Sequence, residues 1–135
     1  MDAYLALLRR WGDRVDLVGP GSADDWMRSH VLDAVGALAA VPAGACSVVD
    51  VGSGAGLPGL VWAICRPDLD VTLCEPRKRR AAFLRAASRE CGVSVEVLAC
   101  RADALPQRSF DVAVGRAVAP YATATTSASS RPTAS

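Results

Sequence analysis

The sequence predicts an α/β protein in which two N-terminal helices precede a parallel sheet of four strands. Three observations lead to this fold class. From residue 46 onward, short apolar runs typical of buried strands alternate with stretches of helical period. A glycine-rich turn directly follows the first of these runs, as in strand-loop-helix units. Before residue 46, only helical periodicity is present.

Helical spacing of apolar residues marks the first two elements. The first is an amphipathic helix whose apolar residues recur every three or four positions, at Tyr4, Leu8, Trp11, Val15 and Val18. A Gly-Pro-Gly break at 19–21 ends it. Ser22 and Asp25 then resemble a capping box that opens a second helix. The second helix carries Trp26, Met27, Val31, Leu32, Val35 and Leu38, and Pro42 and Gly44 end it.

The alternating part divides into strands and helices of ordinary length. The expected order is strand 46–51, helix 57–66, strand 70–75, helix 78–90, strand 94–99, a loop, and strand 110–114. After residue 121 the chain has only small and polar residues with one arginine, so disorder is expected there. The predicted organisation is a helical cap (1–45), a partial α/β core (46–121) and a disordered tail (122–135).

Composition indicates one compact domain and argues against several function classes. With 135 residues, 51% of them apolar, the chain can build one core. A net charge of +1 supplies no general attraction for nucleic acid, so any RNA contact must be local. Five cysteines, mostly in apolar segments and without a C-x-x-C pair, predict buried thiols in a reducing cytoplasm. One histidine argues against a metal site, and no leader or membrane-spanning run is apparent.

The glycine-rich turn predicts a cofactor loop. Gly52, Gly54 and Gly56 allow positive φ angles and close approach of a ligand. The spacing Gly54-x-Gly56-x-x-Gly59 also fits a dinucleotide fingerprint. In a dinucleotide site, however, the first glycine closes the strand, and Gly54 comes two residues too late for that. Asp50 would also repel the two phosphates of a dinucleotide. S-adenosylmethionine has cationic groups and no phosphate, so an acid at the strand tip favours it. A dinucleotide, or a turn that only packs a helix on the sheet, remains an alternative.

Glu75 ends the second strand and is the next candidate. It follows the loop by roughly the 20 residues at which an acid accepts hydrogen bonds from a ribose. Because S-adenosylmethionine and NAD both contain such a ribose, Glu75 supports nucleoside binding without separating them. A solvated strand-end acid is the alternative.

Five motifs occur in order between residues 5 and 121. They are Trp11 with Val15-Asp16-Leu17; His30-Val31-Leu32-Asp33; Asp50 to Gly59; Thr72-Leu73-Cys74-Glu75 with Lys78-Arg79 and Phe83-Leu84; and Arg101-Ala102-Asp103 with Phe110-Asp111 and Arg116-Ala117. In order and spacing they resemble the bacterial ribosomal RNA small subunit methyltransferase G family, also called glucose-inhibited division protein B. The resemblance implies a Rossmann-like class I S-adenosylmethionine-dependent methyltransferase fold.

The same resemblance implies methyl transfer to N7 of a guanine in 16S ribosomal RNA, on the small subunit or a precursor. Guanine N7 has a free lone pair, so positioning suffices, no general base is required, and no catalytic residue is assigned. The resemblance implies that Gly52, Leu57, Ala102, Asp103 and Arg116 contact the cofactor. Asp103 would accept from the adenine amine, although Ala102-Asp103 could be a surface turn. Arg116 would bind the methionine carboxylate or an RNA phosphate, or pair with Asp50 or Asp111.

Three residues are candidates for RNA contact. His30 and Asp33 share a face of the second helix, and His30 either faces substrate or packs. Lys78 and Arg79, within the basic run 77–80, either bind phosphate or form a solvated face.

Because the family continues with a further helix and three strands, we expect a sheet truncated after the fourth strand, in a cytoplasmic monomer. An inactive cofactor-binding relic and a dinucleotide-binding oxidoreductase fragment are the alternative functions.

Overall fold

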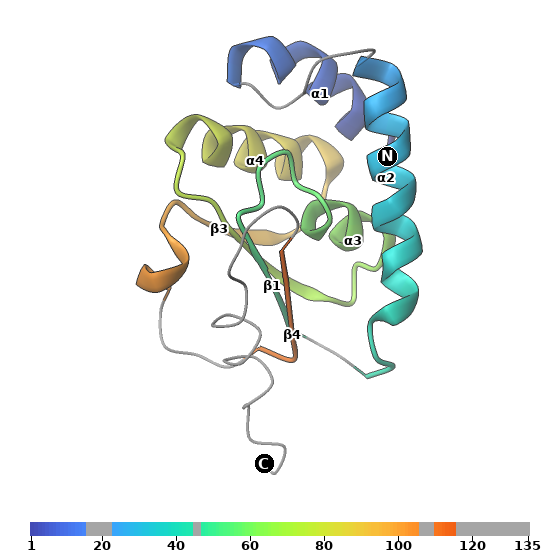
Figure 1. The fold of residues 1–135 in the computed structure, drawn as a ribbon, viewed down its shortest axis with the longest axis vertical. Helices are drawn as coiled ribbons and strands as arrows, with labels where there is room; N and C mark the ends of the chain where they lie inside the picture. The colour runs from blue at the N-terminus through green and yellow to red at the C-terminus, as the bar shows by residue number, and fades with distance from the viewer. Residues whose placement is uncertain (16–22, 45–46, 106–109, 116–135) are drawn as a thin grey trace.

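A computed structural model describes residues 1–15, 23–44, 47–105 and 110–115 (Figure 1). In these ranges, strands β1 (Ser47–Val51), β2 (Asp70–Cys74), β3 (Val95–Leu98) and β4 (Val112–Gly115) form one parallel sheet in the order β3-β2-β1-β4. The helices are α1 (Asp2–Val15), α2 (Ala23–Ala37), α3 (Gly59–Cys65) and α4 (Lys78–Cys91), with 3₁₀ turns η1 (Leu38–Ala40) and η2 (Ala102–Ala104). The predicted α/β class with a parallel four-stranded sheet is confirmed.

The helices share one core on one face of the sheet. Val48 of β1 and Val71 and Leu73 of β2 point to that face and are fully buried. Helix α1 packs on α4, and α2 packs on α3, which places the two N-terminal helices outside the two crossover helices (Figure 1). The fully buried side chains contributed by helices include Tyr4, Leu8, Leu60, Phe83 and Leu84. On the opposite face, Val49, Val51 and Phe110 form a smaller cluster.

Three predicted boundaries, in two elements, move for identifiable reasons. The helix expected over 57–66 begins at Gly59, because the preceding Gly56 is in the left-handed region (φ 92°), which interrupts helical geometry just before it. It ends at Cys65, since Pro67 disfavours helical geometry at the residue before it. The last strand, expected over 110–114, begins at Val112 because Asp111 is held by side-chain contacts with Ser47.

The second helix buries only part of its apolar surface. Val31 and Ala34 are buried, whereas Leu32 is 70% exposed and Val35 is 40% exposed. The indole Nε1–H of Trp62 on α3 donates to the carbonyl of Ala34 at 2.8 Å, so this stripe of α2 faces α3. Ser22 of the expected capping box, Val18 and the expected tail lie outside the described residues. None of the helices in the described ranges is long and apolar enough to cross a bilayer.

The prediction of buried thiols is only partly correct. Cys74 is buried, but Cys91 and Cys100 are partly exposed and Cys65 is exposed. Cys65 is the last residue of α3, where the chain leaves the helix toward the surface at Arg66 and Pro67. Cys46 lies outside the described residues.

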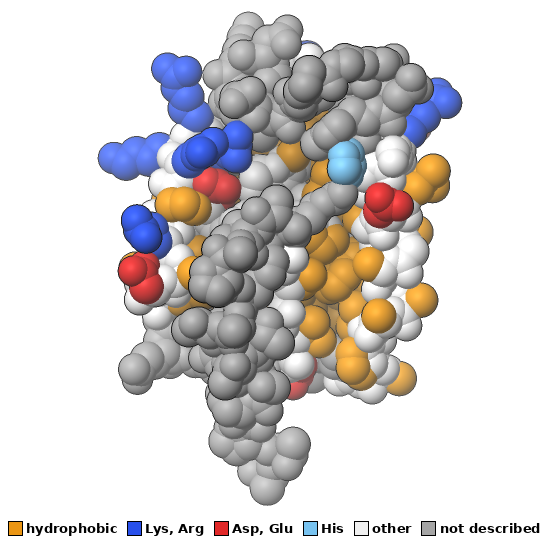
Figure 2. All heavy atoms as spheres, viewed as in Figure 1, with side chains coloured by type: hydrophobic (Ala, Val, Ile, Leu, Met, Phe, Trp, Pro, Cys, Tyr) orange, Lys and Arg blue, Asp and Glu red, His pale blue; other side chains and the backbone are white. Residues whose placement is uncertain are grey.

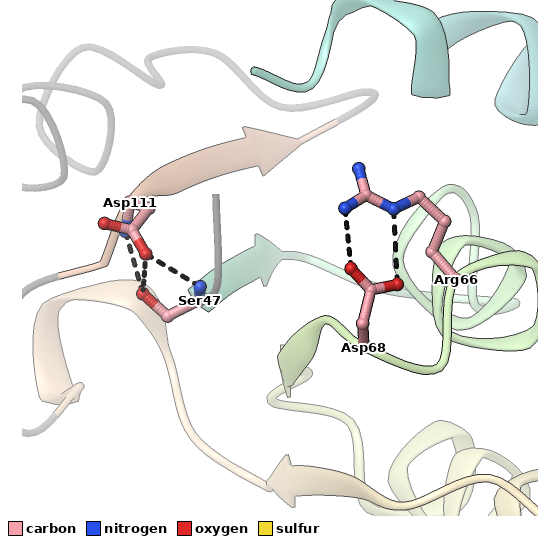
Figure 3. A network of polar contacts seen from close by, with 4 residues as sticks. All are labelled: Ser47, Arg66, Asp68 and Asp111. Atoms are coloured by element: carbon pink, nitrogen blue, oxygen red, sulfur yellow. Dashed lines mark hydrogen bonds and ion pairs between the residues drawn. The ribbon is translucent and has the colours of Figure 1, made fainter. Parts of the chain in front are cut away.

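The amino edge of the sheet is closed by short polar contacts (Figure 3). The backbone N–H and the hydroxyl of Ser47 donate to Asp111 Oδ2 at 2.9 and 3.1 Å, and the Asp111 N–H donates to the Ser47 hydroxyl at 2.9 Å. Arg66 and Asp68 form an ion pair of 2.7 Å before β2. The glycine-rich turn lies at the opposite, carboxyl edge, where ligands of parallel α/β sheets bind.

Candidate cofactor site

The glycine-rich turn is tied to the neighbouring strand by its backbone. The N–H groups of Gly52 and Ser53 both donate to the carbonyl of Cys74, at 2.8 and 3.1 Å, and Gly56 N–H donates to the Ser53 carbonyl at 2.7 Å. Gly52, Gly54 and Gly56 have φ angles of 73°, 54° and 92°. The predicted positive φ angles are therefore confirmed, and the turn is a defined loop joining β1 to α3.

Asp50 lies beneath this loop. Its side chain is fully buried, and Oδ2 accepts a hydrogen bond of 2.9 Å from the backbone N–H of Gly59, the first residue of α3. Oδ1 is buried without a hydrogen-bond partner among the described residues. Burial raises the pKa of Asp50 to about 7, the Gly59 N–H opposes that rise, and the charge of Glu75 adds to it. The acid at the strand tip thus faces the underside of the loop.

Glu75 clamps the loop from the side of β2. It is 3% exposed, so the alternative of a solvated strand-end acid is wrong. Its Oε1 accepts from the N–H of Gly54 at 3.0 Å, and its Oε2 accepts from the N–H of Arg77 at 2.7 Å. Each carboxylate oxygen has a second lone pair, so Glu75 can still accept from a ligand hydroxyl.

Close packing beneath the turn brings α3 against β1. A Cβ at Gly59 would lie 2.5 Å from Asp50 Oδ2 and 2.6 Å from Leu73 Cδ2. A Cβ at Gly56 would lie 2.8 Å from Leu60 Cβ. These two glycines are therefore required for packing, a role that the cofactor pattern alone did not assign to them.

Tyr4 adds a contact that sequence reasoning missed. Its hydroxyl donates to the carbonyl of Ala55 at 2.6 Å, and both residues are buried. The sequence marked Tyr4 only as an apolar position of the first helix. No local signal could have shown the contact, since the two residues are 51 positions apart. Helix α1 therefore holds the glycine loop directly.

The remaining cofactor candidates differ in their exposure. Ala102 and Asp103 are exposed in η2, which follows β3 at the same edge of the sheet. Oδ1 of Asp103 lies 3.6 Å from Nε of Arg101, and both side chains of this ion pair are exposed. Leu57 is 5% exposed and packs in the core, so only its backbone can reach a ligand. Arg116 lies outside the described residues.

The RNA candidates lie on α4 and α2. Lys78 and Arg79 are exposed in the first turn of α4, and Arg77 at its N-cap makes no side-chain cap. Figure 2 shows Lys and Arg side chains gathered over this end of α4. His30 is partly exposed on α2, one turn before Ala34, which contacts α3 through its carbonyl. Asp33 is exposed on the same helix.

The charges around the loop fit a cationic ligand without phosphates. Asp50 and Glu75 are both nearly inaccessible to water and interact repulsively, so a cation nearby relieves their repulsion and an anion increases it. Oδ1 of Asp50 is buried without a hydrogen-bond partner among the described residues, and a positive charge near the loop would stabilise the ionised form of this acid. In the described ranges, no three His, Cys, Asp or Glu side chains are grouped so as to hold a metal ion.

The family model and the curated relatives that match this chain carry the same description. The family model for rRNA small subunit methyltransferase G matches residues 1–133. Proteins named ribosomal RNA small subunit methyltransferase G are similar to this chain. The one from Methylobacillus flagellatus is 43% identical over 117 residues, covering 85% of this chain and 56% of that protein. The one from Mycobacterium leprae is 46% identical over 120 residues, covering 86% and 49%. The chain spans about half the length of the curated relatives it matches.

A solved structure shares the fold. The chain is similar to a mutant of MtNAS in complex with S-adenosylmethionine, with a TM-score of 0.52 and 21% identity, over 88% of this chain and 47% of that chain. At this identity the likeness concerns the fold alone. It confirms the Rossmann-like arrangement that the strand order shows independently.

Proposed function

The chain belongs to the rRNA small subunit methyltransferase G family, and from this premise we propose that it binds S-adenosylmethionine and serves in methylating guanine N7 of 16S ribosomal RNA. The observation that supports cofactor binding best is the glycine loop held between two buried acids. Asp50 lies below the loop and bonds to the N–H of Gly59, and Glu75 bonds to the N–H of Gly54, so two acids lie where a bound phosphate would be repelled.

The proposed roles follow from position. Gly52, Gly54 and Gly56 let the backbone approach the methionine part of the cofactor, to which the Leu57 backbone is adjacent. Glu75 accepts from the ribose, and Ala102 and Asp103 in η2 receive the adenine. Asp50 attracts the ammonium through the loop, and Arg116 is assigned the methionine carboxylate or an RNA phosphate. The cofactor supplies a methyl group on a sulfonium.

Catalysis in this proposal consists of positioning. Guanine N7 presents a lone pair in the plane of the base, so no side chain of this chain must remove a proton first. Holding the two reacting atoms in line can supply roughly 7–11 kcal/mol of the barrier reduction. In this proposal the two loop acids, which accept hydrogen bonds from backbone N–H groups, shape the loop and remove no proton from the base.

The RNA side of the proposal uses the basic end of α4. Lys78 and Arg79 are exposed beside the cofactor edge, where cations can contact phosphate, and His30 is assigned a lesser substrate contact. We assign residues 1–45 to a helical cap and residues 46–121 to the cofactor-binding core. The protein is proposed to act as a monomer in the cytoplasm, without a metal, on the small subunit or its precursor.

Calorimetric titration with S-adenosylmethionine tests the site. The wild-type chain is expected to bind saturably. The variant Gly52→Val is expected to lose binding, because a β-branched residue cannot adopt φ 73° without strain. Gly92→Val is the matched control. Gly92 has φ 67° at the C-terminal end of α4, so valine introduces similar backbone strain there, at a position outside the glycine loop. Equal binding by wild type and Gly52→Val would contradict the assignment of the loop.

Methyl transfer is tested separately, because the chain spans about half of its relatives. Small subunits that lack the N7 mark are incubated with the chain and labelled cofactor, and marked subunits serve as the control. Transfer to unmarked subunits alone supports the activity. Binding without transfer assigns this chain the cofactor site only, and an NADH fluorescence change instead of binding supports a dinucleotide site.

A further inference from the structure

Cys74 lies where three segments of the proposed cofactor site meet. Its carbonyl accepts the N–H groups of Gly52 and Ser53, and Glu75 follows it directly. Its thiol donates to the carbonyl of Cys100 at 3.1 Å, and the two Sγ atoms are 3.8 Å apart. Cys100 begins the short segment that leads into η2.

The sheet register explains why the two thiols meet. Cys74 pairs with Leu98 across β2 and β3, and Cys100 is two residues further, so its side chain points to the same face. Cys74 is 0% exposed, whereas Cys100 is partly exposed. A small dissolved oxidant therefore meets Cys100 first, with Cys74 as the neighbouring thiol. Neither thiol has a role in the proposed methyl transfer.

We propose that Cys74 and Cys100 are a site of reversible oxidation, which hydrogen peroxide converts to a disulfide and a thiol reductant restores. The Cys100 thiolate attacks peroxide, so an S–O bond forms, the O–O bond breaks, and water leaves after protonation. The Cys74 sulfur then attacks the sulfenic acid of Cys100. An S–S bond forms, the S–O bond breaks, and the proton of Cys74 leaves with the hydroxide as a second water.

The surroundings of the two thiols determine which of them reacts first with an oxidant. Burial, with the neighbouring Cys100, raises the pKa of the Cys74 thiol to about 12, so Cys74 is not itself the group that starts the reaction. Its proximity to Cys100 compensates, because a tethered thiol reacts at a high effective concentration. In a reducing compartment such a disulfide is transient, which suits a regulatory role.

The disulfide acts on the cofactor site through two connections. It removes the hydrogen bond from Cys74 to the Cys100 carbonyl, and it draws together two sulfurs that now lie 3.8 Å apart, against about 2.05 Å in a disulfide. The segment before Ala102 and the backbone beside Glu75 must both adjust. We expect cofactor affinity to fall roughly tenfold, the effect of about one lost hydrogen bond.

Mass spectrometry tests the pair without reference to the cofactor. The reduced full chain is treated with hydrogen peroxide, blocked with N-ethylmaleimide and digested. The expected result is a peptide joining Cys74 to Cys100 that dithiothreitol separates. Cys100→Ser is expected to abolish it, and Cys65→Ser and Cys91→Ser to retain it. Oxidation confined to Cys65, or a sulfinic Cys100 beside an unmodified Cys74, would overturn the proposal.

Titration with S-adenosylmethionine tests the coupling, and this second arm rests on the proposed function. The oxidised chain is expected to bind more weakly than the reduced chain, with recovery after dithiothreitol. Equal affinity of both forms would overturn the coupling. If the reduced chain binds no cofactor, the proposed function fails, and the cross-linked peptide still decides whether the thiol pair exists.

Discussion

The backbone N–H of Gly59 donates to Oδ2 of Asp50 at 2.9 Å, and the same approach leaves no space for a side chain at residue 59. One contact thus joins the end of β1 to the start of α3 beneath the glycine loop. Asp50 on β1 thus accepts from the first N–H of α3, as an N-cap side chain does in other helices, and the N-cap residue Pro58 makes no such bond. Packing, charge and loop shape are therefore linked at this point.

Gly59→Ala is expected to destabilise the fold. Its Cβ would lie 2.5 Å from Asp50 Oδ2 and 2.6 Å from Leu73 Cδ2, both in fully buried side chains, so β1 and α3 must separate. The expected loss in the free energy of unfolding is about 1–3 kcal/mol. Urea unfolding followed by circular dichroism measures it.

Gly36→Ala is the matched control. Gly36 lies within α2, and a Cβ there meets nothing within 4 Å. Because alanine favours a helix over glycine by roughly 0.5–1 kcal/mol, stability should be unchanged or higher. Equal losses in the two variants would show that space at residue 59 is not the cause.

Asp50 is expected to make stability depend on pH. Its pKa is about 7 in the folded protein, above its ordinary value, chiefly because of burial. Between the two values the folded protein holds a proton that the unfolded chain has released. The free energy of unfolding therefore falls as pH rises through this window, by about 1.4 kcal/mol per pH unit.

Asp50→Asn is expected to lack this contribution. Urea unfolding of wild type and variant at pH 5 and pH 8 measures it, because other titrating groups cancel in the difference. The variant should gain stability relative to wild type at the higher pH, while its cofactor affinity falls with the lost charge. Parallel pH profiles would contradict a buried titrating Asp50.

The sequence predicted the elements of this site better than their connections. Strand-loop-helix order and positive φ at Gly52 follow from local residue types, so they were predictable. The burial of Glu75, and the position of Asp50 below the glycine loop, depend on how β1 and β2 pair. The local sequence pattern does not determine that pairing. The Tyr4 contact joins residues that are distant in sequence, and only the packed structure shows it.

Tyr4→Phe is expected to weaken both the fold and the loop. It leaves the buried carbonyl of Ala55 without the donor that now lies at 2.6 Å, at a cost of about 1–3 kcal/mol. Trp62→Phe is the control, because it removes a buried hydrogen bond to Ala34 between α2 and α3. Thermal unfolding should record a loss in both variants, and calorimetry should record weaker cofactor binding in Tyr4→Phe only. Similar affinity in the two variants would remove Tyr4 from the support of the loop.

Glu75→Gln is expected to reduce cofactor affinity. The amide replaces one acceptor oxygen by a donor, which then faces the N–H of Gly54 or Arg77. One lost hydrogen bond to a charged group corresponds to about 1.5–3 kcal/mol, or roughly 10- to 100-fold in the dissociation constant. Glu90→Gln, an exposed change on α4, controls for net charge. Unchanged affinity in Glu75→Gln would reject the ribose assignment.

Lys78→Gln with Arg79→Gln is expected to weaken RNA binding in a way that depends on salt. Both side chains are exposed in the first turn of α4, where the helix dipole adds to their positive charge. Each lost phosphate contact lowers the slope of log K against log salt by about 0.7–0.9, so two contacts change it by roughly 1.4–1.8. Binding to 16S ribosomal RNA across a salt series measures the slope.

Arg10→Gln with Arg28→Gln removes the same charge from exposed positions on α1 and α2 and should leave the slope nearly unchanged. If the two pairs reduce the slope equally, net charge rather than this end of α4 governs binding, and the RNA assignment of Lys78 and Arg79 is wrong.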